Sequence, residues 1–263
     1  MTDALDLSRD FADRPGAALV VGGSGGLGAA IVAALAARGS DVALTFRGNE
    51  EAADQVARQV GDHGQRAWTV QLDLRNHEGC RAAVDSISED AGGLHTLVYA
   101  AGPHVPQRHL SQVSALEVQD QLVADSAGFF AVAVACLPHL RQSQGSIVAV
   151  TTAATDRYPV RDGLSSIPKA AVEATVRGLA AEEGRFGVRA NSVGPGMLTD
   201  GMAERLMASG DLDERALDVA RANIPLRRFG GANDIAEAVC FLASPRAGFI
   251  SGQHLNVDGG FTV

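Results

Sequence analysis

The sequence predicts an α/β fold, a doubly wound parallel sheet in a single domain. Short apolar runs of strand type alternate along the chain with segments of helical period, as in a parallel sheet that is covered by helices on both faces. The first run leads directly into a glycine-rich stretch that opens the first helix. The 263 residues, 46% of them hydrophobic, suffice for one core.

The elements follow one another without an internal repeat or a linker. Strands are predicted where short apolar runs are rich in β-branched residues: 17–21, 41–46, 66–72, 96–101, 146–152 and 188–193. Helices are predicted between them from the 3.6-residue period: 29–39, 50–60, 78–91, 116–140 and 169–184. We therefore expect residues 16–263 to form the domain and the polar residues 1–15 to form a loose arm.

The glycine-rich stretch after the first strand reads VVGGSGGLGAA. Gly22, Gly26 and Gly28 give the spacing GxxxGxG, whereas Gly23, Gly25 and Gly28 fit GxGxxG, so spacing alone does not fix the register. In either register, residues without Cβ allow a tight turn and bring backbone amides to a pyrophosphate at the helix N-terminus. This context predicts a dinucleotide site on a Rossmann fold.

The end of the second strand indicates which dinucleotide is bound. An NAD site places an acidic residue about 20 residues beyond the glycines. Here that place holds Phe46 and Arg47. A guanidinium group pairs with a ribose 2′-phosphate, so we expect NADP(H) to be preferred over NAD(H). The alternative is that Arg47 is a solvated surface residue.

Charge and composition bear on partners and compartment. The formal net charge of −9 makes nucleic acid and anionic membranes poor partners, and we expect neither. We find no apolar run of the roughly 18 residues that a spanning helix needs and no apolar signal segment at the start. Cys80, Cys136 and Cys240 lack metal-ligand spacing and are interpreted as core residues. A cytoplasmic location is expected.

With these motifs, the chain resembles the single-domain short-chain dehydrogenase/reductase family from Ala17 to its C-terminus. The glycine motif TGxxxGxG of the family appears as VGGSGGLG, the adenine-binding aspartate as QLDL, the carboxamide-binding segment as PGMLT, and the tetramer-forming C-terminal region as residues 249–260. The resemblance implies a homotetramer. It also implies cofactor contacts from Gly22, Ser24, Gly26, Leu27, Gly28, Asp73, Leu74, Ala101, Gly102, Lys169, Pro195, Gly196 and Thr199.

The sequence departs from the family pattern where the chemistry is expected. The family's NNAG reads YAAG at residues 99–102, so both asparagines are lost. The resemblance places Asp125 where the family has its catalytic asparagine, Thr152 where it has serine, and Ser165 where it has tyrosine. Of the catalytic YxxxK pair only Lys169 is kept. We predict an atypical catalytic site made of Lys169, Ser165, Thr152 and Asp125, with Tyr158 as a candidate.

These replacements change what the site can do. Ser165 and Lys169 are four residues apart, so on a helix they share a face. A serine hydroxyl is a poor general acid, but it can donate a hydrogen bond to a developing oxyanion. Asp125 beside Lys169 would pair with it and hold it as a cation; the alternative is a partly exposed helix residue. Pro168 leads us to expect the helix to begin later than in the family.

The proton donor is therefore the open question. Tyr158 and Asp162 lie between the fifth strand and Lys169, and either is a candidate. Enoyl- and dienoyl-thioester reductases of the family relocate the tyrosine in this segment, but their tyrosine positions fall on Ala154 and Asp162 here. His104 and His109, after the fourth strand, are further candidates, although surface histidines without a role are commoner.

We thus expect an NADP(H)-dependent reductase that acts on a carbonyl, or on a C=C bond activated by one, with a non-standard proton donor. The segment 199–230 is predicted to be a substrate lid, and its Met202, Leu206 and Met207 suggest a small apolar substrate. The alternative from another class is a member that binds the cofactor without redox chemistry, as a structural partner or a sensor.

Overall fold

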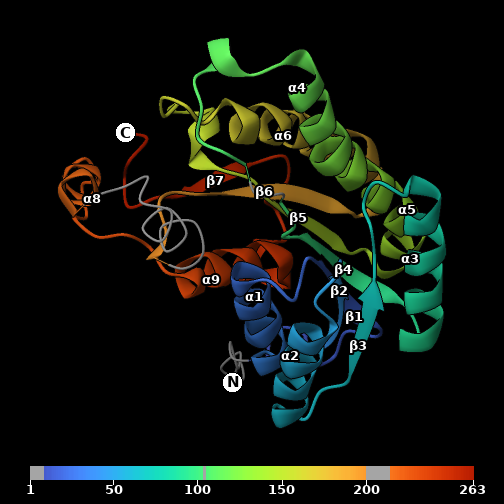
Figure 1. The fold of residues 1–263 in the computed structure, drawn as a ribbon. Coiled ribbons are helices and arrows are strands. Elements are labelled where there is room, and N and C mark those ends of the chain that lie inside the picture. Colours follow the sequence, from blue (N-terminus) through green and yellow to red (C-terminus); the bar gives the residue numbers. More distant parts are fainter. Residues whose placement is uncertain (1–8, 103–104, 200–213) are drawn as a thin grey trace.

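The structure is a computed structural model that describes residues 9–102, 105–199 and 214–263. Seven parallel strands form one sheet in the order β3-β2-β1-β4-β5-β6-β7 (Figure 1). Their bounds are β1 Ala17–Val21, β2 Asp41–Phe46, β3 Ala67–Gln71, β4 Leu94–Tyr99, β5 Ser146–Val150, β6 Arg189–Pro195 and β7 His254–Val257. The predicted α/β fold with a doubly wound parallel sheet is confirmed.

Helices cover both faces of this sheet (Figure 1). One face carries α1 Gly26–Ala37, α2 Glu50–Asp62 and α9 Ala232–Ala243; the other carries α3 His77–Ala91, α5 Gly128–Ser143 and α6 Gly163–Glu183. The described chain also forms α4 Ala115–Gln121, α8 Glu214–Ala222, the π-helical turn η2 Leu122–Ala127 and the 3-10 turns η1 Leu110–Gln112, η3 Ala153–Thr155, η4 Gly184–Phe186 and η6 Pro245–Ala247. The strand order reverses between β1 and β4, and in such sheets ligands bind at the carboxyl ends beside that point.

Local sequence explains where the helices begin and end. Asn49 and Asn76 cap α2 and α3, each accepting a hydrogen bond from a backbone N–H in the first turn. Ser114 and Glu117 form a capping box at α4. Gly92 ends α3 in the left-handed conformation, with φ of 75°. The predicted helices are therefore present, with boundaries set by these caps.

Two predicted helices differ from the observed ones. The single helix expected over 116–140 is divided by the π-helical turn η2 into α4 and α5. The expectation that Pro168 delays the next helix is wrong, because α6 begins at Gly163 and Pro168 is its sixth residue. The first turn is held by backbone hydrogen bonds from Ser165 and Ser166 to the Asp162 carbonyl, and Ser126 donates to the Pro168 carbonyl at 2.9 Å.

The prediction of a loose arm over 1–15 does not hold for its second half. Phe11 is 1% exposed and stacks on His95, with ring centroids 5.8 Å apart. Arg14 donates to the Ser143 carbonyl at 2.9 Å, and Asp10 pairs with Arg246 at 3.0 Å. Residues 1–8 lie outside the described part of the chain. The described part of this arm is thus held to the domain by one buried aromatic side chain, Phe11. The polar composition of the segment does not reveal it.

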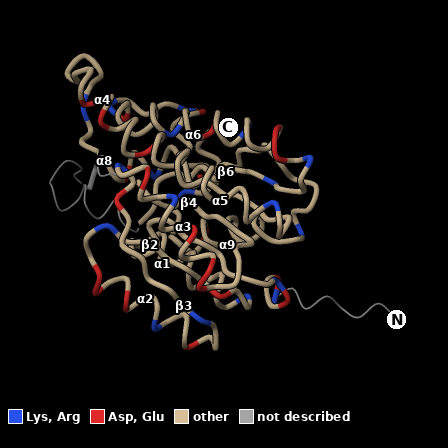
Figure 2. The backbone as a smooth tube through the Cα atoms, turned by 90° about the vertical axis from the view of Figure 1, so that its right-hand side faces the viewer, with Lys and Arg blue, Asp and Glu red and all other residues tan. Residues whose placement is uncertain are grey.

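The helical run Ala115–Ser143 is long and apolar enough to cross a membrane by composition, with a mean hydropathy of 1.5 over its best window. Its apolar side packs in the protein core instead, because Phe129, Val132, Cys136 and Leu140 are buried against the sheet and α3. All three cysteines are free and buried. Figure 2 shows acidic and basic residues interspersed along the backbone. The predictions about membranes, nucleic acid and location stay predictions.

Candidate functional site

Two adjoining cavities lie at the carboxyl ends of the strands. The Arg47 cavity is lined by Gly22, Ser24, Thr45, Phe46, Arg47, Asn49, Asp73, Leu74, Arg75 and neighbouring backbone. The Lys169 cavity, of about 350 Å³, is lined by Leu27, Gly28, Val105, Asp125, Thr151, Thr152, Leu164, Ser165, Lys169 and residues 195–198 among others. Both include Gly25, Gly26 and residues 100–102, so they form one continuous cleft.

The glycine loop is shaped by contacts that exclude side chains. Gly22 has a φ of 79°, and a Cβ there would lie 2.9 Å from the Ala101 Cα atom. A Cβ on Gly28 would lie 2.2 Å from the Gly22 carbonyl oxygen. At Gly26, the first residue of α1, a Cβ would meet nothing within 4 Å. The helix N-terminus therefore opens on the cleft, and its N–H groups fit a pyrophosphate.

The Arg47 cavity contains the arginine that the sequence predicts to contact a ribose 2′-phosphate. Among the described residues no carboxylate pairs with Arg47, whose backbone carbonyl accepts a hydrogen bond from the Gln71 side chain at 2.9 Å. Asp73 accepts from the Arg75 backbone N–H at 3.0 Å. Arg75 lines the same cavity, and its guanidinium lies 3.8 Å from Asp120. Sequence reasoning did not single out Arg75, although it stands two residues after Asp73.

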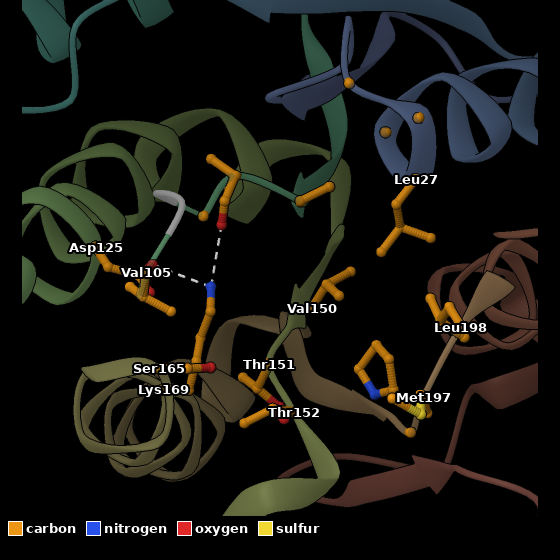
Figure 3. Close-up of a pocket in the computed structure, with 18 of the residues that line it drawn as sticks. Leu27, Val105, Asp125, Val150, Thr151, Thr152, Ser165, Lys169, Met197 and Leu198 are labelled. Atoms are coloured by element: carbon orange, nitrogen blue, oxygen red, sulfur yellow. Dashed lines mark hydrogen bonds and ion pairs between the residues drawn. The ribbon is translucent and has the colours of Figure 1, made fainter. Parts of the chain in front are cut away.

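The Lys169 ammonium group is held between two acceptors (Figure 3). Its Nζ donates to Asp125 Oδ1 at 3.0 Å and to the Ala101 carbonyl oxygen at 3.0 Å. Lys169 and Asp125 are only 8% and 1% exposed. The predicted pairing is therefore confirmed, and the alternative of a partly exposed helix residue for Asp125 is excluded. A buried carboxylate without this partner would be costly.

Tyr99, at the end of β4, completes this cluster. Its hydroxyl donates to Asp125 Oδ1 at 2.9 Å and to the Asp125 carbonyl at 3.0 Å, and Lys169 Nζ lies 5.2 Å from its ring centroid. Burial, and then the charge of Asp125, raise the pKa of Tyr99 well above its usual value. In the sequence, Tyr99 is noticed only because it stands where the family motif NNAG has an asparagine. We name Tyr99, Asp125 and Lys169 the charged cluster.

The π-helical turn η2 contributes Asp125 to this cluster. A π turn accommodates one extra residue in a continuing helix, and such turns occur often at functional sites. The next residue, Ser126, bonds to α6 through the Pro168 carbonyl. Asp125 and Lys169 are thereby fixed by neighbouring helices, and the pair does not depend on a flexible loop.

Thr152 and Ser165 both line the Lys169 cavity, where their side chains face one another, Thr152 from the segment just after β5 and Ser165 from α6 (Figure 3). The Thr152 hydroxyl oxygen accepts from the Ala154 backbone N–H at 3.2 Å, which leaves its own proton available to a ligand. Thr155 donates to the Thr152 carbonyl and to Glu173. The two hydroxyl groups that were predicted to replace serine and tyrosine are thus in one place.

Other predicted residues are not brought to this cavity. Tyr158 is 48% exposed and lies outside the described lining of the Lys169 cavity, with its hydroxyl beside Gly163. The structure therefore does not support it as the proton donor. His109 is exposed, and His104 lies outside the described residues. Asp162, in contrast, is 8% exposed and accepts from Gln107 at 2.8 Å. Burial raises the pKa of this carboxyl group.

The third side of the cavity comes from the end of β6. Pro195 and Gly196 line it as predicted, together with Met197 and Leu198. Thr199 instead bonds to the Gly230 carbonyl, at 2.8 Å from its backbone N–H and 3.3 Å from its hydroxyl. Met202, Leu206 and Met207 of the predicted lid lie outside the described residues. Its described part is Thr199 with residues 214–230, which include α8.

Comparisons with known proteins cover almost the whole chain. Residues 21–262 match a family model described as enoyl-(acyl carrier protein) reductase. The cis-4-hydroxycyclohexanecarboxylate dehydrogenase of Sinomonas cyclohexanicum is 32% identical over 254 residues, which are 96% of this chain and 98% of the relative.

Two solved structures carry cofactors. A short-chain dehydrogenase from Burkholderia cenocepacia in complex with NADP is 32% identical, with a TM-score of 0.86 over 97% of this chain and 100% of that one. Carveol dehydrogenase from Mycobacterium avium in complex with NAD is 25% identical, with a TM-score of 0.86 over 95% of this chain and 98% of that one.

Proposed function

Because this chain belongs to the short-chain dehydrogenase/reductase family, whose members among its relatives are oxidoreductases, we propose that it is an NADP(H)-dependent reductase of a small apolar carbonyl compound or of a C=C bond activated by a carbonyl. The observation that supports this most is the continuity of the cleft. A glycine loop open at the N-terminus of α1 leads directly to Lys169, Thr152 and Ser165.

Each part of the cleft has a role in this proposal. Backbone N–H groups at Gly26, Leu27 and Gly28 would hold the pyrophosphate, and Arg47 with Arg75 would hold the 2′-phosphate of the adenosine ribose. The nicotinamide, when bound, supplies the hydride. Thr152 and Ser165 would donate hydrogen bonds to the substrate carbonyl oxygen and stabilise the charge that develops there.

The substrate class follows from the rest of the lining. Val105, Val150, Leu164, Met197 and Leu198 give the Lys169 cavity a mostly aliphatic wall. Such a wall favours an apolar substrate with one polar group, which the two hydroxyls would orient. Reduction of an activated C=C bond needs hydride delivery and an oxyanion hydrogen bond, whereas ketone reduction also needs a proton on oxygen.

The cofactor preference has its own test. The solved neighbours include one complex with NADP and one with NAD, so the family alone does not decide the preference. We expect Arg47→Asp to weaken NADPH binding by at least tenfold, because a carboxylate would repel the 2′-phosphate, while NADH binding is kept. Isothermal titration of both variants with both cofactors measures this. Arg58→Asp, on the exposed side of α2, is the matched control. Equal NADPH affinity in Arg47→Asp and the wild type would contradict the assignment.

A second function is favoured by the charged cluster. The ammonium group of Lys169 already has two acceptors in Asp125 and Ala101, which would suit a member that binds the cofactor without turnover, as a structural partner or sensor. NADPH titration followed by turnover assays with ketones and enoyl thioesters separates the two functions. NADPH binding without any turnover would favour the second.

Assembly and location complete the proposal. We propose a homotetramer in the cytoplasm. Phe249, Leu255 and Val263 are exposed apolar residues at the C-terminal side of the sheet, where β7 is the edge strand, and burial between subunits would remove them from water. Light scattering coupled to size-exclusion chromatography would measure the mass, and a monomer would contradict this assembly.

A further inference from the structure

A buried carboxylate lies on α6 one turn beyond the residues that line the Lys169 cavity. Ser165, Lys169 and Glu173 are spaced four residues apart, so the helix presents them on one face. Ser165 and Lys169 line the cavity, whereas Glu173 is outside its described lining and is 6% exposed. Any effect of Glu173 on a bound substrate therefore has to pass through another residue.

Thr155 connects Glu173 to the turn that carries Thr152. The Thr155 hydroxyl donates to Glu173 Oε1 at 2.9 Å and to the Thr152 carbonyl oxygen at 3.0 Å. A hydroxyl has one proton, so the two acceptors share it in a three-centre bond. The contact with a carboxylate is the stronger of the two. Glu173 thus holds the Thr155 oxygen at the place from which it also contacts the Thr152 carbonyl.

The same turn fixes the side chain of Thr152. The backbone N–H of Ala154, which is 5% exposed, donates to the Thr152 hydroxyl oxygen at 3.2 Å. Thr152 therefore has two contacts within the turn, one at its side chain and one at its carbonyl. The direction of its hydroxyl into the cavity depends on the turn staying closed.

The surroundings of Glu173 offer its charge little compensation. The described residues give it no lysine or arginine partner, and its ionisable neighbour among them is His254 of β7, with Nδ1 3.7 Å from Oε1. That imidazole is hydrogen-bonded to Ser192 and to Asn256, each at 2.9 Å. A buried carboxylate is costly unless charges and hydrogen bonds compensate it. A carboxylate kept at this cost, with its closest described contact on the turn of the cavity, indicates a role in the site.

We propose that Glu173 is a positioning residue that acts through Thr155 to keep the Thr152 hydroxyl directed at the substrate oxygen. This role rests on the proposed function as a reductase, in which Thr152 donates a hydrogen bond to that oxygen. Thr152 is the catalytic residue that touches the substrate, and Glu173 and Thr155 act through it. Because such donors work only when they are correctly placed, a displacement of about 1 Å has a large cost.

A second buried glutamate on the same helix provides a comparison. Glu183, the last residue of α6, is 5% exposed and accepts two hydrogen bonds from Arg141, at 2.6 and 2.8 Å. That pair joins α6 to α5, and neither residue belongs to the described lining of the cavity. Glu183 thus has the guanidinium partner that Glu173 lacks among the described residues. It serves the packing of two helices and is the matched control for Glu173.

The test uses the full-length protein with NADPH and, as substrates, cyclohexanone, acetophenone and a crotonyl thioester. With a substrate that the wild type reduces, Glu173→Ala should lower kcat by about ten- to a hundredfold and keep the NADPH dissociation constant within about twofold of the wild-type value. Glu173→Gln retains an acceptor oxygen and should recover most of the rate. Glu183→Ala should keep the wild-type kcat even though it lowers the free energy of unfolding.

The route through Thr155 and Thr152 is tested by combined variants. Thr155→Val should lower kcat as Glu173→Ala does, and Thr155→Ser should recover most of the rate. The variant with both Glu173→Ala and Thr155→Val should be no slower than either single one, and Glu173→Ala should cost nothing further in a Thr152→Val background. Thr175→Val removes a hydroxyl that bonds within α6, and this control should keep the wild-type kcat.

A readout without turnover comes from backbone hydrogen exchange followed by mass spectrometry, with NADPH present. Peptides that span residues 150–158 should exchange about fivefold faster in Glu173→Ala and Thr155→Val than in the wild type, because the turn opens more often. Glu173→Gln, Thr155→Ser and Glu183→Ala should match the wild type in these peptides.

The outcomes separate the two proposals. No turnover of any substrate by the wild type overturns the proposed function, and hydrogen exchange still decides whether Glu173 holds the turn. Turnover in which Glu173→Ala keeps the wild-type kcat, or in which it slows the Thr152→Val variant further, overturns the positioning role alone. Unchanged exchange over residues 150–158 in Glu173→Ala, or a rise there that Glu183→Ala shares, overturns that role whatever the activity.

Discussion

Strand β4 carries a buried polar cluster at each end, and the two clusters differ in charge. At its amino end, His95 contacts Ser40 at 3.3 Å and Thr96 at 3.0 Å, and Thr96 lies 3.5 Å from Ser146. Phe11 closes this neutral cluster from solvent by stacking on His95. At its carboxyl end, Tyr99 joins the charged cluster, which borders the cleft.

The two clusters differ in whether their buried polar groups carry charge. In the neutral cluster, burial lowers the pKa of His95 to about 3, so the ring stays uncharged and only holds the strand ends together. In the charged cluster, two opposite charges are kept buried, at a desolvation cost that mutual pairing offsets. We infer that the first cluster serves the fold and the second serves the cofactor and substrate.

The largest expected effect comes from breaking the charged cluster. Asp125→Ala leaves the buried ammonium group of Lys169 without its counter-charge and should lower the free energy of unfolding by about 3–5 kcal/mol. Urea denaturation measures this. The double variant Asp125→Leu with Lys169→Met should recover most of the loss, because it removes both charges. A loss under 1 kcal/mol in Asp125→Ala would contradict the importance of the pair.

A smaller effect is expected at Tyr99. Tyr99→Phe removes the hydroxyl that bonds to the Asp125 carboxylate and should cost about 1.5–3 kcal/mol, the range for hydrogen bonds to charged groups. The ring and its contact with Phe129 are retained. The same substitution in the uncharged double variant should cost clearly less. Equal costs in both backgrounds would mean that Tyr99 acts by packing alone.

The neutral cluster predicts a dependence of stability on pH. Because the His95 pKa is near 6.5 when unfolded and about 3 when folded, the unfolded chain binds the extra proton between these values. Stability should therefore fall as pH drops below 6.5, by about 2 kcal/mol at pH 5 from this group. His95→Gln should remove that part of the pH slope in denaturation experiments at pH 7 and pH 5. An unchanged slope would show that His95 titrates normally.

The strands of the sheet could be predicted well from the sequence because they are short, buried runs of apolar residues. The predicted bounds of β1 and β2 match the structure, and the remaining predicted strands are within two residues of the observed ones. Parallel central strands are apolar on both sides, so they stand out from amphipathic helices. Phe11 was missed because a single anchor in a polar stretch leaves no periodic signal.

The candidate site was predicted where residues follow a motif and missed where contacts join distant segments. Asp125 and Lys169 were expected to pair, and they do. Tyr99 was not foreseen, because its bond to Asp125 crosses from a strand to a helix 26 residues later. Asp162 accepts a hydrogen bond from Gln107, which lies 55 residues earlier on a loop whose path neither spacing nor composition indicates.

The π-helical turn η2 sets how far α4 is rotated about its axis relative to α5. One extra residue turns α4 by about 100° relative to α5, and so decides which way Glu117 of α4 faces. Glu117 holds Arg108, and the neighbouring Gln107 holds Asp162. The angular setting of α4 is thus linked through Arg108 and Gln107 to Asp162, which immediately precedes α6. Transplanting this active site into a related protein would therefore require the length of that helix, and exchanging side chains would not suffice.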